Sequence, residues 1–190
     1  GRLVITFNGE IYNYREVRAE LIAAGCAFRS DSDTEVLLQA YERWGRDAVP
    51  KLRGMFAFAI WDRSDRTLFC VRDRLGVKPF YWSEPAPGAF AFASEVRTLL
   101  ATDCVGRRLS AEGVHAYLAT GSQTGAAPLL EGLRELAPGQ TLTWHDGQVS
   151  VDTYWTVPHG IGADPRPEAA ELASLLREAV RYRLVADVPV

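Results

Sequence analysis

Three polar groups that could take part in catalysis follow a short apolar run near the start of the sequence. Asn8, Gly9 and Glu10 come directly after residues 3–7, which predict a buried strand. The Asn8 side-chain amide and the Gly9 backbone N–H can both donate to a carbonyl oxygen that becomes tetrahedral. Glycine leaves that approach open because it has no side chain. With the Glu10 carboxylate, these groups can hold a small zwitterionic amide and stabilise an oxyanion.

Asn8-Gly9 is also the strongest short signal of a type I′ hairpin turn, and taken alone the pair favours that turn. The residues that follow, 10–13, lead into a predicted helix and offer no return strand. This context weakens the turn and favours the oxyanion interpretation.

Asp33 is a second candidate, at the start of another predicted helix. Ser32 and Glu35 form a capping-box pattern around it, which is a purely structural use. Alternatively, the Asp33 carboxylate could pair with a substrate ammonium. Both are compatible if Ser32 caps the helix and Asp33 faces a pocket, and the spacing does not choose between them.

The composition bounds the class of protein. The 190 residues are 47% hydrophobic, which suffices for one well-cored domain or for one domain and part of another. The net charge is -3 and both signs are interspersed, so nucleic acid and an anionic membrane surface are not expected partners. No apolar stretch approaches the roughly 20 residues that span a bilayer.

The three cysteines, Cys26, Cys70 and Cys104, are scattered and form no CxxC pair. An odd, scattered set argues against a disulfide framework and against a zinc site, and it favours a reducing cytoplasm. The three histidines share no metal-ligand spacing, so no metal site is expected.

Helices and strands are expected in blocks. Helices are predicted after Asn13 up to Gly25, from Ser32 to Gly45, and over 94–100, 110–119 and 168–184. Strands are predicted over 3–7, 55–61, 67–71, 77–82 and 89–93, with two or three more between 132 and 155 and one over 185–190. Such blocks, with hairpins joining the strands, indicate an α+β layered domain with a mainly antiparallel sheet.

Local sequence signals indicate where several of these elements begin, which face is buried and where the chain turns. Asn13 is expected to cap the first helix with Glu16 as its capping-box partner, and Ser110 is expected to cap the helix over 110–119. Val17, Leu21 and Ile22 are expected on the buried face of the first helix. The stretch 72–81 reads as a charged, tight connection in which an Arg–Asp network braces the sheet edge, with Gly76 and Pro79 shaping the turn.

Residues 158–167 are rich in glycine and proline and predict a linker. The helix after it carries an apolar face of Leu172, Leu175, Leu176, Ala179 and Val180. We therefore expect one domain over 1–157 and the truncated start of a second over 158–190.

Several motifs occur in the order seen in glutamine-hydrolysing asparagine synthetases, and the sequence resembles that family over essentially its whole length. They are residues 7–13, 32–35, 52–62, 72–81, 93–95, 136–139, 154–155 and 183–190. The resemblance implies a class II glutamine amidotransferase with an N-terminal-nucleophile hydrolase fold, an αββα sandwich of mainly antiparallel sheets. By the same resemblance this sandwich is truncated at its N-terminus and followed by the first helix and strand of an ATP pyrophosphatase domain.

The resemblance also implies roles. Asn8 and Gly9 would form the oxyanion hole, while Glu10 and Asp33 would hold the amino-acid end of glutamine. The family's N-terminal nucleophilic cysteine and its carboxylate-binding arginine match nothing in this chain. ATP and Mg²⁺ would act with aspartate in the missing synthetase domain, and none would be bound by this chain. A homodimer is compatible with this picture. The 190 residues alone are expected neither to hydrolyse glutamine nor to make asparagine.

Two alternatives remain. One is a related synthetase of the β-lactam synthetase or lasso-peptide cyclase type, some of which have lost glutaminase function; the intact Asn8, Gly9, Glu10 and Asp33 argue against that loss. The other is a non-catalytic module that binds glutamine without turnover.

Overall fold

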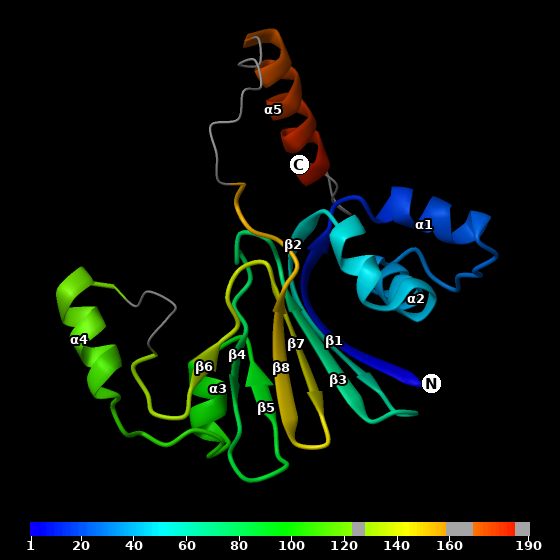
Figure 1. Cartoon of the computed structure of the whole chain (residues 1–190). Helices are drawn as coiled ribbons and strands as arrows, with labels where there is room; N and C mark the ends of the chain where they lie inside the picture. Colours follow the sequence, from blue (N-terminus) through cyan, green and yellow to red (C-terminus); the bar gives the residue numbers. More distant parts are fainter. Residues whose placement is uncertain (123–127, 159–168, 185–190) are drawn as a thin grey trace.

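The computed structural model describes residues 1–122, 128–158 and 169–184 (Figure 1). Its elements, in chain order, are β1 Leu3–Ile11, α1 Tyr14–Ala23, α2 Asp33–Trp44, the 3-10 helix η1 Gly45–Lys51, β2 Gly54–Asp62, β3 Thr67–Arg72, β4 Tyr81–Ser83, β5 Ala91–Ala93, α3 Val96–Ala101, α4 Ala111–Thr120, β6 Arg134–Glu135, β7 Gln140–His145, β8 Gln148–Thr153 and α5 Ala169–Arg183.

Two antiparallel sheets pack face to face between helices. The larger sheet has the order β1-β2-β3-β7-β8 and the smaller has the order β5-β4-β6. One core, which includes Phe56 and Phe58, lies between the larger sheet and the helices α1 and α2 (Figure 1). A second core lies between the sheets, around Cys70 and Leu142. A third, around Leu99, lies between the smaller sheet and α3. The α+β class and the expected αββα order are confirmed.

β1 runs further than the sequence predicted. Instead of ending at Phe7 it continues to Ile11, and it pairs with β2 over its whole length. Asn8 lies opposite Ala57 and Gly9 opposite Phe56, so the Asn-Gly pair stands inside a strand. The type I′ turn is therefore excluded.

Other local predictions are confirmed. The β2–β3 hairpin forms around residues 62–66 as expected. α2 begins after Ser32, whose Oγ accepts from the Thr34 N–H at 3.1 Å, and it ends before Gly45. Ser110 caps α4 by accepting from the Gly113 N–H.

Two predicted capping interactions are wrong. The Asn13 side chain makes no cap bond; it donates to the Lys51 carbonyl at 2.9 Å and accepts from the Arg53 N–H at 2.7 Å, because it is buried against the start of β2. Glu35 completes no capping box with Ser32. Its carboxylate instead accepts from the N–H groups of residues 29 and 30, which orders the loop before α2. Ile22, expected on the buried face of α1, is exposed.

The strand predicted over 77–82 is also wrong, since β4 covers only Tyr81–Ser83. Asp73 explains the difference. Its carboxylate accepts from the backbone N–H groups of Leu75, Val77 and Lys78, which folds the segment into a loop and removes donors that a strand would need. The Arg–Asp network expected here is also wrong, because Arg72 forms its ion pair with Glu135, at 2.7 Å, and not with an aspartate.

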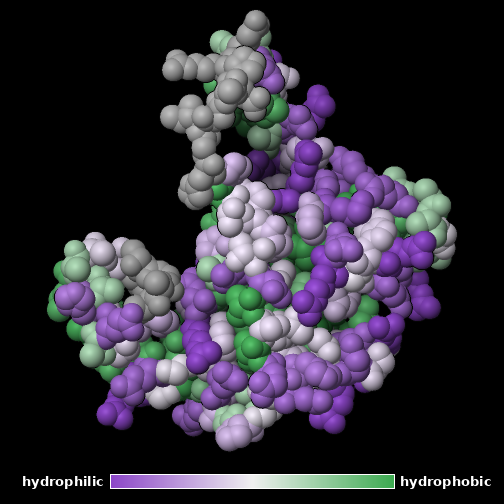
Figure 2. Space-filling model, in the orientation of Figure 1, coloured by the Kyte–Doolittle hydropathy of each residue, from purple (hydrophilic) through white to green (hydrophobic). Residues whose placement is uncertain are grey.

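α5 forms where the amphipathic pattern predicted it, but its apolar residues Leu172, Leu175, Leu176 and Val180 are exposed. Figure 2 shows hydrophobic surface on the two helices that extend from the body, α4 and α5. The strand predicted over 185–190 and nearly all of the predicted linker lie outside the described residues. Among the helices of the described ranges, none has the length and apolar character needed to cross a membrane.

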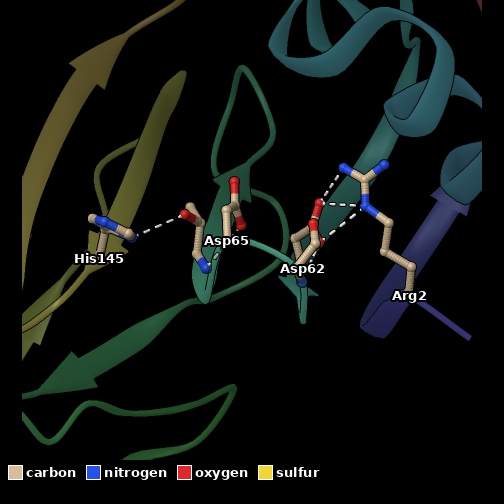
Figure 3. Close-up of polar contacts among 6 residues, drawn as sticks. Arg2, Asp62, Asp65 and His145 are labelled. Atoms are coloured by element: carbon tan, nitrogen blue, oxygen red, sulfur yellow. Dashed lines mark hydrogen bonds and ion pairs between the residues drawn. The ribbon is translucent and has the colours of Figure 1, made fainter.

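The end of the larger sheet where Arg2 lies is held by polar contacts across four neighbouring strands, β1, β2, β3 and β7 (Figure 3). The Arg2 guanidinium binds the Asp62 carboxylate with its Nε at 3.0 and 2.9 Å from the two oxygens. Asp65 shapes the turn by accepting from the Thr67 N–H, and the Thr67 hydroxyl lies 3.2 Å from Nδ1 of His145 on β7. These contacts tie β1, the β2–β3 turn and β7 together.

Asp62 should make the stability of the sandwich acid-sensitive. Hydrogen bonds from Arg2 and then from Ser64 hold the pKa of the Asp62 carboxyl well below its usual range. Its stabilising contribution is therefore complete above the unfolded pKa and is lost as the pH falls below about 4. We expect Asp62→Asn to lower the melting temperature at pH 7, with a difference from wild type that shrinks toward pH 3. Thermal unfolding between pH 7 and pH 3 measures this, with Asp65→Asn as control; a difference that stays constant with pH would contradict it.

Candidate active site

A cavity of about 350 Å³ opens where the smaller sheet stops covering β1 and β2. The Asn8 side chain lines it from β1. The other lining residues come from β1, β2, β5, the loop before β4 and the start of α3: Thr6, Ala57, Phe58, Ala59, Phe80, Phe92, Ala93, Ser94, Glu95 and Thr98. An amide donor thus faces a hollow between the two sheets.

The strand register decides where the Gly9 N–H points. Just outside the two ends of β1, the Arg2 carbonyl accepts from the Arg63 N–H, and the Tyr12 N–H donates to the Arg53 carbonyl. Arg2 and Tyr12 both have even numbers. In an antiparallel pair every second residue of a strand bonds to the partner strand, so along β1 these are the even-numbered residues. The register is unbroken from 3 to 11, so Gly9 is one of the residues whose N–H points away from β2. Within the part of the chain that the structure describes, β1 is the edge strand of its sheet, so this donor faces the open side.

β1 and β2 approach each other unusually closely at this point. Gly9 has φ +149°, and a Cβ built there would lie 2.1 Å from the Met55 carbonyl oxygen. Gly54 makes the reciprocal approach, since its Cβ would lie 2.1 Å from the Glu10 carbonyl oxygen. Both positions therefore require glycine for steric reasons. At residue 9 the missing side chain also leaves the backbone N–H accessible.

Gly9→Ala should disrupt the site by displacing β1. The added methyl group meets backbone and the residue keeps a φ that L-amino acids avoid, so we expect the free energy of unfolding to fall by about 3 kcal/mol. Gly25→Ala is the matched control, because Gly25 also has positive φ but a methyl group added there would meet no atom within 4 Å. Chemical denaturation measures both variants. Equal losses would show that the backbone conformation, and not the close approach of the strands, is what requires glycine at residue 9.

Asp33 is attached to the same edge of β1. Its Oδ2 accepts from the N–H of Ile11 at 3.1 Å, and Ile11 follows Gly9 by two residues, so the two N–H groups share the open side. Asp33 is half-buried, while Glu10 is exposed on the same sheet face as Asn8. The structure therefore places Asn8, Gly9, Glu10 and Asp33 along one stretch of β1, and of these only Asn8 lines the cavity.

Ser94 belongs to the site although the sequence reasoning assigned it no role. Asn8 Nδ2 donates to Ser94 Oγ at 3.1 Å, across 86 residues of sequence. The sequence signals were its place at the start of a predicted helix, just after a predicted strand, and its presence in the motif at residues 93–95.

None of the three cysteines is placed to attack a substrate in this cavity. Cys70 is buried in β3, where burial raises the pKa of its thiol. Cys26 packs against the core on the other face of the larger sheet, and Cys104 packs against the core under α3. All three are free thiols.

A larger cavity, of about 740 Å³, lies between the start of β2, the Asp73 loop and α5. It is lined by Tyr12, Arg53, Gly54, Met55, Asp73, Arg74, Leu75, Val77, Trp155, Leu175, Glu178, Ala179, Tyr182 and Arg183. Asn8 lines the smaller cavity and not this one.

Comparisons with known proteins identify relatives of this chain. A sequence model of the glutamine amidotransferase domain matches residues 1–155. The glutamine-hydrolysing asparagine synthetase 3 of Bacillus subtilis is 39% identical over 188 residues, which cover 98% of this chain and 30% of that protein. A putative glutamine-hydrolysing asparagine synthetase of Mycobacterium tuberculosis is 50% identical over 100 residues, which cover 52% of this chain and 15% of that protein. The chain thus spans less than a third of the length of these relatives.

Among solved structures, the glutamine phosphoribosylpyrophosphate amidotransferase of Bacillus subtilis superposes with a TM-score of 0.56 at 23% identity. The match covers 82% of this chain and 30% of that one. At this identity the likeness concerns the fold.

Proposed function

Because this chain belongs to the glutamine amidotransferase domain family, with its N-terminal-nucleophile hydrolase fold, we propose that it is the glutaminase part of a glutamine-hydrolysing asparagine synthetase. In this proposal the domain releases ammonia from the side-chain amide of glutamine. The observation that carries the proposal is the donor pair on β1, an Asn8 amide in a cavity next to a Gly9 N–H on the open strand edge.

The two donors would act on the oxygen of the glutamine amide. When a thiolate adds to the amide carbon, the carbonyl oxygen becomes an oxyanion, and donors already aimed at it lower the barrier. The close approach of β1 to β2 around Gly9 and Gly54 keeps the Gly9 donor in place before substrate arrives. Little reorganisation is then needed during the reaction.

The carboxylates would hold the amino-acid end of glutamine. Asp33 Oδ2 is anchored by the Ile11 N–H. Its Oδ1, to which the Thr34 hydroxyl donates at 3.4 Å, can also accept from a substrate ammonium. Glu10 precedes Ile11 on β1 and is exposed, so its carboxylate is available to pair with the same ammonium. We therefore assign Asp33 as the main ammonium partner.

The attacking thiol is assigned to a cysteine that these 190 residues do not contain, because the positions of Cys26, Cys70 and Cys104 do not suit it. The inactivity expected of these residues on their own stays a prediction. In the same way, ATP, Mg²⁺ and aspartate are proposed to react in a part of the protein outside this chain. A cytoplasmic location is proposed from the three free thiols, which a reducing compartment preserves.

The test uses the full-length natural protein. Glutamate release from glutamine should be detected, and asparagine should form from aspartate with ATP, Mg²⁺ and either glutamine or ammonia. Glutamate release with no amidation of aspartate would mean that the acceptor is a compound other than aspartate, as in the β-lactam synthetase type. Glutamine binding without glutamate release would overturn the enzymatic proposal in favour of a binding module.

A further inference from the structure

The hydroxyl of Ser94 is the one polar group that the structure bonds to the Asn8 amide within the described residues. Ser94 directly follows β5, a strand of the smaller sheet, and precedes α3, whereas Asn8 stands on β1 of the larger sheet. The 3.1 Å bond from Asn8 Nδ2 to Ser94 Oγ thus crosses from one sheet to the other at the cavity.

This bond bears on catalysis because an asparagine amide is not fixed by its own torsions. The terminal torsion of asparagine is broad and roughly two-fold, so the amide can present either its N–H or its C=O to the cavity. The Nδ2 atom carries two hydrogens. In the structure one of them is donated to Ser94 Oγ, and the second remains for another acceptor. A carbonyl turned toward an oxyanion would repel it.

We propose that Ser94 is a positioning residue for glutamine hydrolysis, which holds the Asn8 amide with its second N–H toward the developing oxyanion. The inference rests on the proposed glutaminase function and deepens it. Ser94 does not touch the reacting atoms and acts only through Asn8. Its effect should therefore appear in the chemical step and not in the binding of glutamine.

Steady-state glutaminase kinetics of the full-length protein test this with Ser94→Ala. Loss of one neutral hydrogen bond should lower kcat roughly 3- to 10-fold, with KM for glutamine changed less than about twofold. Ammonia-dependent synthesis should be unchanged. Ser94→Thr, which keeps the hydroxyl, should restore most of kcat. Thr102→Ala is the matched control, because the Thr102 hydroxyl lies on the far end of α3 and bonds only to carbonyls of its own helix.

A double-mutant cycle gives the sharper test. If Ser94 acts only through Asn8, Asn8→Ala combined with Ser94→Ala should be no slower than Asn8→Ala alone. The aldehyde analogue of glutamine, whose thiol adduct carries the oxyanion, should bind Ser94→Ala more weakly by the same factor as kcat falls. Additive losses, or equal losses of glutamine- and ammonia-dependent activity, would overturn the inference. Absence of glutamate release by the wild type would instead overturn the proposed function.

Discussion

Replacing Asn8 by alanine is expected to slow glutamine-dependent turnover about 100-fold or more, as the loss of one oxyanion donor typically does. Ammonia-dependent synthesis should stay nearly intact. The reason is that the Asn8 amide faces the cavity, where its only described bond is to Ser94, so its loss removes a donor without exposing a core. Parallel assays of asparagine formation from glutamine and from ammonia measure the selectivity.

Two further variants sharpen this result. Asn8→Asp keeps the shape but replaces the donor by a negative charge, so it should be at least as slow as Asn8→Ala. Asn13→Ala is the matched control, because the buried Asn13 amide bonds only to the backbone of Lys51 and Arg53. It should lower stability and affect both activities alike. If Asn8→Ala also reduced both activities equally, Asn8 would be structural and the oxyanion assignment would be wrong.

The second large effect is expected at Asp73, which is 1% exposed. Its Oδ1 accepts from the N–H groups of Leu75 and Val77, and its Oδ2 accepts from those of Lys78 and Phe56, all at 3.0 to 3.1 Å. Four backbone dipoles therefore stabilise one buried carboxylate.

Arg72 complements this arrangement from the neighbouring position. Its guanidinium donates to the carbonyls of Lys78, Gly76 and Leu136 and pairs with Glu135. Asp73 thus satisfies the amide hydrogens of the loop while Arg72 satisfies its carbonyls. The loop supplies Leu75 and Val77 to the wall of the larger cavity, so the pair maintains the shape of that wall.

Asp73→Asn should lower the free energy of unfolding by about 4 kcal/mol, because its amide would turn an N–H₂ group toward two backbone N–H donors and leave them unsatisfied. The substitution hardly changes volume, so a cavity contributes little. Chemical denaturation measures the loss. Asp65→Asn, in the exposed β2–β3 turn with a single accepted N–H, should cost less than about 1 kcal/mol. A similarly small loss at Asp73 would mean that the loop is held by Arg72 alone.

Local signals in the sequence sufficed for much of the secondary structure. α2 begins and ends where Ser32 and Gly45 predict, and the β2–β3 hairpin turns within residues 62–66. The ends of α2 and the position of the hairpin turn depend on contacts between residues a few positions apart, so the local sequence predicts them directly. Prediction failed where a side chain bonded to backbone groups that its sequence pattern did not indicate. Asn13 turned from its expected cap to the backbone at Lys51 and Arg53, and Asp73 accepted from the N–H groups of the residues after it, which replaced a predicted strand by a loop.

The sequence by itself identified the chemical groups of the candidate site, Asn8, Gly9, Glu10 and Asp33, and determined the α+β class of the domain. Only the tertiary structure decided what these groups can reach. The register with β2 aims the Gly9 N–H at the open edge, and a slip of one residue would turn it into the sheet. The contact between Asn8 and Ser94 likewise exists only because two sheets pack together. Strand register and sheet packing depend on partners far apart in the chain, and no local pattern specifies them.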